Sequence, residues 1–120
     1  MYLIRAEANA KLGNAQLAID DVNLIRTRAE LTGTQLYTVD NLKGKASILD
    51  VVLEERRLEL AFEGQRAGDL YRNNRDMVRA YPGFHSLDRY NQTISPTHPR
   101  VVFLIPDREV KLNTNLTQNP

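Results

Sequence analysis

Three charged residues fall within the apolar face of one expected helix, at residues 46–63. Winding this segment at about 100° per residue places Arg56, Glu59 and Glu63 among aliphatic side chains, at i, i+3 and i+7. An isolated buried charge is costly, so charges in such a position have to be paired and hydrogen-bonded. Arg66, which follows the helix, supplies a second cation within reach.

Two kinds of chemistry fit this spacing. Glu59 and Glu63 lie one helical turn apart, and two neighbouring carboxylates can share a proton and work as acid and base. Arg56 and Arg66 equally supply compensating cations, and bidentate pairs between arginine and carboxylate suit low-dielectric sites. We interpret the four residues as a structural ion-pair network that docks the helix onto its neighbours. The catalytic alternative requires both carboxylates to face an open cleft.

Aromatic residues among polar ones form a second candidate site. Tyr81, Phe84 and Tyr90 are interspersed with histidine, aspartate, asparagine and glutamine in a stretch without clear periodicity. Aromatic rings can stack on a sugar while polar groups fix its orientation. Tyr71 stands in a second polar stretch of the same kind, for which a short amphipathic helix is the alternative interpretation. These four residues are the candidate ligand contacts.

No metal or cofactor site is predicted. His85 and His98 are 13 residues apart, with no third ligand at a telling spacing. The sequence contains no phosphate-binding glycine loop, no nucleophile elbow and no zinc signature.

The overall composition indicates one ordinary globular domain. The chain has 120 residues, of which 42% are hydrophobic and 26% charged, and its net charge is +1. Such a balance gives no general attraction to nucleic acid. The absence of cysteine excludes a disulfide framework, a thiolate metal site and a cysteine nucleophile. The sequence has no apolar run of about 18 residues that would span a bilayer, and its start does not read as a signal peptide.

The elements that would position these residues are mostly helices. Apolar residues at helical spacing predict helices over residues 2–12 and 15–29. Gly13-Asn14 between them supplies a stop and a new cap, so the two helices are expected to pack antiparallel. The first helix lacks a capping residue, from which we expect the chain to be cut from a longer one.

The remaining elements follow from turn residues and apolar runs. Five consecutive apolar residues, Val101–Ile105, predict a buried strand or buried extended segment that Pro106 stops. The expected order after the second helix is a loop at 30–44 with a brief extended piece at 36–39, the charged helix ending at Gly64, a short helix at 66–74 with 76–81 as its candidate continuation, a loop at 84–99, the apolar segment, one helical turn at 107–110 and an irregular tail.

The first helical pair resembles a tetratricopeptide unit. Ala8, the Leu12-Gly13-Asn14 turn, Ala18 and the Ile19–Val22 stripe match its pattern of small residues where two helices touch. The expected fold class is therefore mainly α: a tetratricopeptide-like hairpin over about residues 1–31, packed with further helices, plus a C-terminal extended segment.

Three segments taken together resemble the C-terminal part of the SusD/RagB family. They are Leu3–Ala8, then Glu55–Arg66 with Asp69-Leu70 and Arg72, then Phe103–Asn113 with Asn115–Pro120. The resemblance spans essentially the whole chain, which we treat as a single domain over 1–120. Family members are several times longer, so the chain would be a C-terminal portion.

The resemblance implies a function. Members are nutrient-binding lipoproteins of the Bacteroidetes outer membrane, held at the cell surface by an N-terminal lipid anchor that this chain lacks. They lie over a SusC-like TonB-dependent transporter and bind glycans or other nutrients for uptake. By this resemblance the chain is not an enzyme, needs no cofactor and contributes mainly scaffold.

Two other functions stay open at this point. One is a stand-alone protein-interaction module of tetratricopeptide type, which needs further repeats and a concave polar groove. The other is an enzyme that uses Glu59 and Glu63. A portion separated from a larger body would also expose apolar surface, so self-association is expected.

Overall fold

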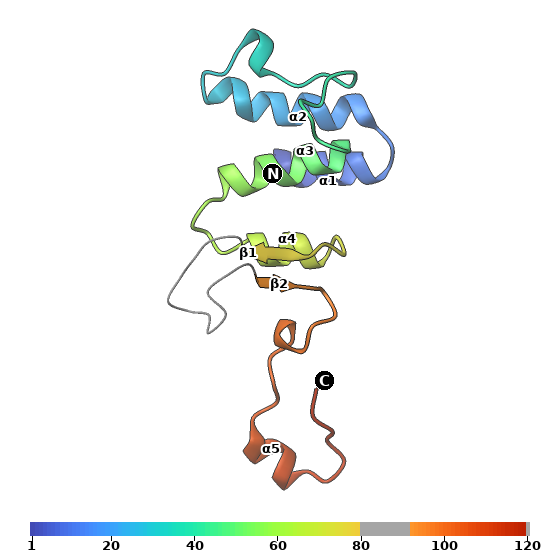
Figure 1. Cartoon of the computed structure of the whole chain (residues 1–120), viewed down its shortest axis with the longest axis vertical. Coiled ribbons are helices and arrows are strands. Elements are labelled where there is room, and N and C mark those ends of the chain that lie inside the picture. The colour runs from blue at the N-terminus through green and yellow to red at the C-terminus, as the bar shows by residue number, and fades with distance from the viewer. Residues whose placement is uncertain (80–91, 120) are drawn as a thin grey trace. The chain divides into compact units, whose positions relative to one another are not determined.

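The computed structural model describes residues 1–79 and 92–119 (Figure 1). The chain divides into two compact units, Met1–Arg66 and Ala67–Pro120, which we treat one at a time. Most of the regular structure in the described residues is helical, which confirms the predicted mainly α class. That residues 1–120 form one domain stays a prediction. The elements in order are α1 (Tyr2–Lys11), α2 (Ala15–Arg28), η1 (Gly33–Gln35), α3 (Ile48–Glu59), α4 (Arg66–Tyr71), β1 (Met77–Arg79), β2 (Gln92–Ile94), η2 (Pro99–Val101) and α5 (Asp107–Leu112).

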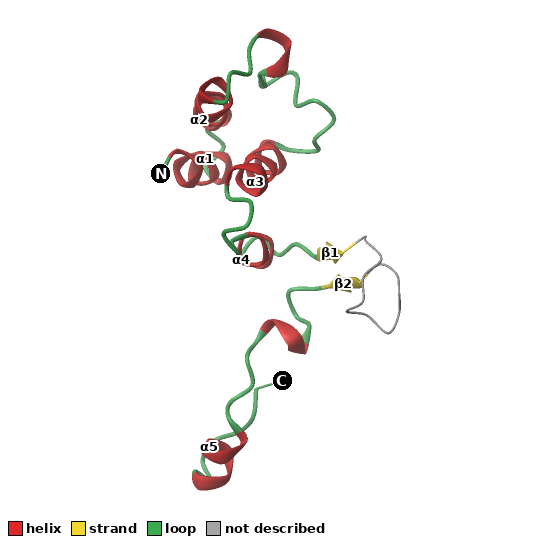
Figure 2. Cartoon of the chain, turned by 90° about the vertical axis from the view of Figure 1, so that its left-hand side faces the viewer, coloured by secondary structure: helices red, strands yellow, loops and turns green. Residues whose placement is uncertain are grey.

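The predicted helical hairpin is formed by α1 and α2. Gly13 has a φ of +81°, a left-handed conformation that glycine adopts without a steric penalty and that reverses the chain within two residues. Ala6 and Ala18 are fully buried, and their small side chains let the two helices approach closely. Helix α3 packs against both helices of the hairpin, and Figure 2 shows the three nearly end-on.

The core of the first unit lies between these three helices. Its members are aliphatic residues at helical spacing, completed by one aromatic residue from the loop after α2. They are Leu3, Ala6, Ala18, Ile19, Val22, Ile25, Tyr37, Val51 and Val52.

Helix α3 is shorter than predicted at both ends. It begins after Ser47, whose hydroxyl accepts a hydrogen bond from the Asp50 backbone N–H at 3.1 Å, as an N-cap should. It ends at Glu59, and Phe62 beyond it has a φ of +69° and is fully exposed. The predicted extension to residue 63 is therefore wrong, because the apolar residues after Leu60 have no core to pack on within the described part of the chain.

The loop between α2 and α3 is locally ordered. The side chains of Thr32 and Gln35 form a capping box around η1. The extended piece expected at residues 36–39 is reduced to a single bridge between Thr38 and Asn41.

The second unit contains α4, a two-stranded antiparallel ribbon and α5. The ribbon pairs β1 with β2 in the register Met77–Ile94, Val78–Thr93 and Arg79–Gln92. Both strands lie where the sequence predicted either helix or loop. Each strand has three residues, too few for an alternation of apolar and polar side chains to be recognised in the sequence. The strand with which each one pairs is also distant in the sequence. Across the described residues, no helix has both the length and the apolar character needed to cross a membrane.

The apolar segment after η2 is not buried. Val102 is 47% exposed, Phe103 95% and Leu104 66%, and none belongs to a strand. The segment is irregular backbone, as one of the two predicted forms allowed, but its predicted burial is wrong. A run of apolar residues predicts burial only where another surface is present to cover it.

Truncation of the Ile19 side chain should destabilise the core of the first unit. Ile19→Ala removes a fully buried side chain and should lower the free energy of unfolding by about 2–5 kcal/mol. Leu17→Ala is the matched control, because Leu17 is 55% exposed on the same helix. Urea denaturation followed by circular dichroism measures both. Equal effects would contradict this assignment of the core.

Candidate functional site

Arg56 is the one member of the predicted charged network that is buried. It is 6% exposed, and its Nε lies 3.9 Å from Oε2 of Glu7, which is equally buried. Glu7 comes from α1 and also meets Lys11 at 3.2 Å. The burial of Arg56 was predicted, whereas this partner was missed because it lies on another helix and nothing local in the sequence marks it.

Glu59 lies at the rim of a pocket in the first unit and not in the core. It forms an ion pair with Arg28 of α2. The side chain of Arg28 is largely exposed and that of Glu59 is half-buried. The pocket has a volume of about 220 Å³ and is lined by Met1, Tyr2, Leu3, Ile4, Ile25, Arg28, Arg56, Glu59 and Leu60. Arg56 thus reaches this pocket from its buried position.

The other two predicted members lie apart from this pocket. Glu63 follows the end of α3 and is exposed. Arg66 donates from Nη1 to the carbonyl oxygen of Leu53 at 3.3 Å. The predicted four-membered network is therefore wrong in its membership, since Glu59 pairs with Arg28 and Arg56 pairs with Glu7.

The arrangement does not support the catalytic carboxylate pair. Only Glu59 lines the pocket, and Arg28 holds its carboxylate in an ion pair. Glu63 stands beyond the helix, in a turn where helical spacing no longer relates it to Glu59. Two carboxylates facing one cleft, which acid–base catalysis by this pair requires, are not brought together.

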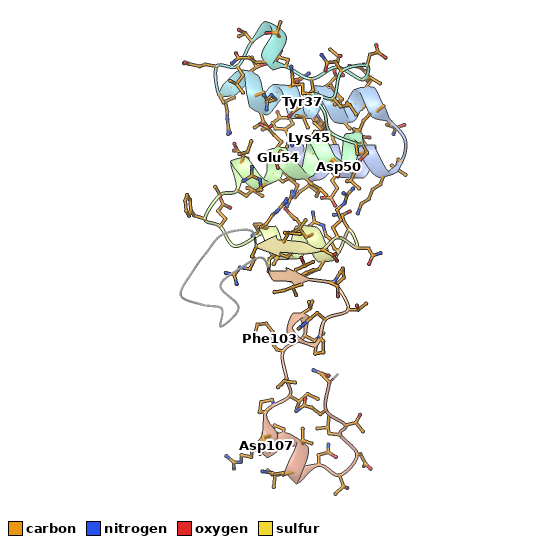
Figure 3. All side chains as sticks on the ribbon, viewed as in Figure 1. Tyr37, Lys45, Asp50, Glu54, Phe103 and Asp107 are labelled. Carbon is orange, nitrogen blue, oxygen red and sulfur yellow. The ribbon has the colours of Figure 1, made fainter. Side chains whose placement is uncertain are left out.

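A denser charged cluster surrounds Arg26, which the sequence did not reveal. Its Nη1 lies 2.8 Å from Oε2 of Glu55, and both side chains are nearly buried. Its Nε and Nη2 donate to the carbonyl oxygen of Gln35 at 3.2 and 2.9 Å. The guanidinium also stacks 4.6 Å from the ring centre of Tyr37, the residue labelled in Figure 3. Arg26 therefore joins α2, the following loop and α3, using both its charge and its flat face.

Asn23 strengthens the same attachment. Its side-chain amide donates to the Tyr37 carbonyl at 2.8 Å and accepts from the Tyr37 N–H at 2.9 Å. One side chain thus satisfies both backbone groups of a buried loop residue, which would otherwise be costly to bury.

Two further charged pairs shift a pKa in the first unit. Arg5 bonds the buried carboxylate of Asp21 at 2.6 and 2.8 Å, which joins α1 to α2 and raises the pKa of Arg5. Arg57 bonds Glu54 at 2.7 and 2.9 Å and lowers the pKa of that carboxyl. Because the pKa of Glu54 is lower in the folded chain, the pair stabilises the fold at pH values above the ordinary carboxyl pKa. This stabilisation is lost as the pH falls through the lowered pKa of the folded state.

The aromatic candidates are mostly outside the described residues. Tyr81, Phe84 and Tyr90 lie within residues 80–91, and their role stays a prediction. Tyr71 ends α4 and is half-buried, while its neighbours Asp69 and Leu70 are buried. Over residues 1–79 and 92–119 there is no cluster of three or more histidine, cysteine or acidic side chains that could hold a metal ion.

Removing Arg56 should deprive the buried carboxylate of Glu7 of its buried cation, while the half-exposed Lys11 stays beside it at 3.2 Å. Arg56→Ala leaves Glu7 without its buried cation, and we expect a loss of about 3–5 kcal/mol in the free energy of unfolding. Arg57→Ala, one residue along and exposed, should cost no more than about 1 kcal/mol. A thermal melt of Arg56→Ala that matches the Arg57→Ala melt would refute the assignment.

Removing Arg26 should release the loop after α2. In Arg26→Ala the Gln35 carbonyl loses its donors and the Tyr37 ring loses its cation. Exchange of the Tyr37 backbone amide, measured by NMR, should accelerate by about 10-fold or more. Arg28→Ala is the control, because its pair with Glu59 lies at the surface of the same helix. Unchanged protection of Tyr37 in Arg26→Ala would contradict the inferred attachment.

Comparison with known proteins identifies the family. The model of the SusD family, which also bears the name RagB, matches residues 1–120. A SusD-like protein P38 of Formosa agariphila is 44% identical over 79 residues, which is 62% of this chain and 16% of that protein. A SusD superfamily crystal structure from Bacteroides vulgatus superposes with a TM-score of 0.67 at 29% identity, over 99% of this chain and 25% of that one. The structure of BT4246 gives a TM-score of 0.68 at 28% identity, over 99% of this chain and 22% of that one.

These figures also set the scale of the chain. It spans about a sixth of the curated relative and about a quarter of the solved structures. The family match extends over every residue, and the superposition covers 99% of the chain. The chain belongs to the SusD family.

Proposed function

We propose that this chain is part of a protein that binds glycans for uptake through a SusC-like TonB-dependent transporter, and that it contributes mainly scaffold. The observation that supports the proposal is the family match over residues 1–120. SusD family proteins are binding proteins and not enzymes, and we propose the same of this one. Its place would be the surface of the outer membrane, as a lipoprotein.

The first unit supports the scaffold role. The buried or partly buried polar interactions of Arg26, Arg56 and Asp21 join helices to each other or to a loop. Charged groups engaged in this way are not available to a ligand. The pocket beside Glu59 is small, at about 220 Å³, whereas pockets for drug-sized ligands have about 300–1,000 Å³. Ligand contact is therefore better placed on the aromatic candidates, Tyr71 and the residues of segment 80–91.

The stand-alone interaction module is the weaker alternative. Helices α1, α2 and α3 make one hairpin and a third helix within the described residues, whereas tetratricopeptide arrays need about three repeats for stability. The family match also continues through the second unit, beyond the hairpin.

Purification from the native membrane tests the transporter partner. A tagged gene product should fractionate with the outer membrane and bring down a TonB-dependent transporter, identified by mass spectrometry. An irrelevant outer-membrane lipoprotein with the same tag is the control. Recovery from the soluble fraction without any transporter would argue against the proposed partner and location.

Glycan binding tests the ligand class and the aromatic candidates. The natural gene product, screened on a glycan array, should bind at least one polysaccharide. Alanine at Tyr71, Tyr81, Phe84 or Tyr90 should weaken that binding by about 2- to 10-fold wherever the ring stacks on a sugar. Phe62→Ala is the control, because Phe62 is fully exposed and is not a candidate. If none of the four substitutions changes glycan binding, the ligand contacts lie in other parts of the protein.

A further inference from the structure

We draw no further inference here: the strongest candidate, the pocket of about 220 Å³ lined by residues of α1, α2 and α3, carries none, because its charged side chains are engaged in ion pairs with one another or with Glu7 and nothing in the structure shows what would occupy it.

Discussion

The buried ion pair between Arg26 and Glu55 constrains the first unit more than any other contact. A carboxylate removed from water is tolerated only with a cation beside it, and Glu55 lies on α3 whereas Arg26 lies on α2. The guanidinium also requires the Gln35 carbonyl and the Tyr37 ring, both from the intervening loop. Two helices and a loop must therefore reach their positions together, and the apolar core between α1, α2 and α3 packs within that arrangement.

The other charges follow the same logic. Asp21 receives Arg5 across the hairpin, and Glu7 receives Arg56 across the contact between α1 and α3. Each helix of the unit is thus joined to a neighbour by at least one ion pair, in addition to apolar packing. Such pairs add little to stability when compared with well-packed apolar residues, but breaking one is costly. They fit a scaffold whose helices must keep one arrangement.

The sequence predicted local features well and distant pairings poorly. Periodicity and the Gly13-Asn14 turn were sufficient for α1 and α2, because helix formation and chain reversal depend on neighbouring residues. The position of Arg56 within an apolar face correctly indicated its burial, but its partner Glu7 is 49 residues away and no local pattern points to it. The same holds for Arg26 with Glu55, and for the pairing of β1 with β2. The exposure of Phe103 could not be predicted. An apolar run indicates that the segment needs a second surface to cover it, but not whether that surface is present.

The two side-chain amides that pair with backbone have a consequence for loop length. The side-chain amide of Asn23 bonds both backbone groups of Tyr37, and that of Gln118 bonds both backbone groups of Ile105. In each case the two bonded residues lie at the two ends of a longer stretch of chain. These hydrogen bonds involve only the two end residues, so they do not fix the number of residues between them. Lengthening a loop adds only about 0.6 kcal/mol for each doubling. The connection after α2 can therefore gain or lose residues among proteins that share this scaffold, while the helices on both sides of it stay in place.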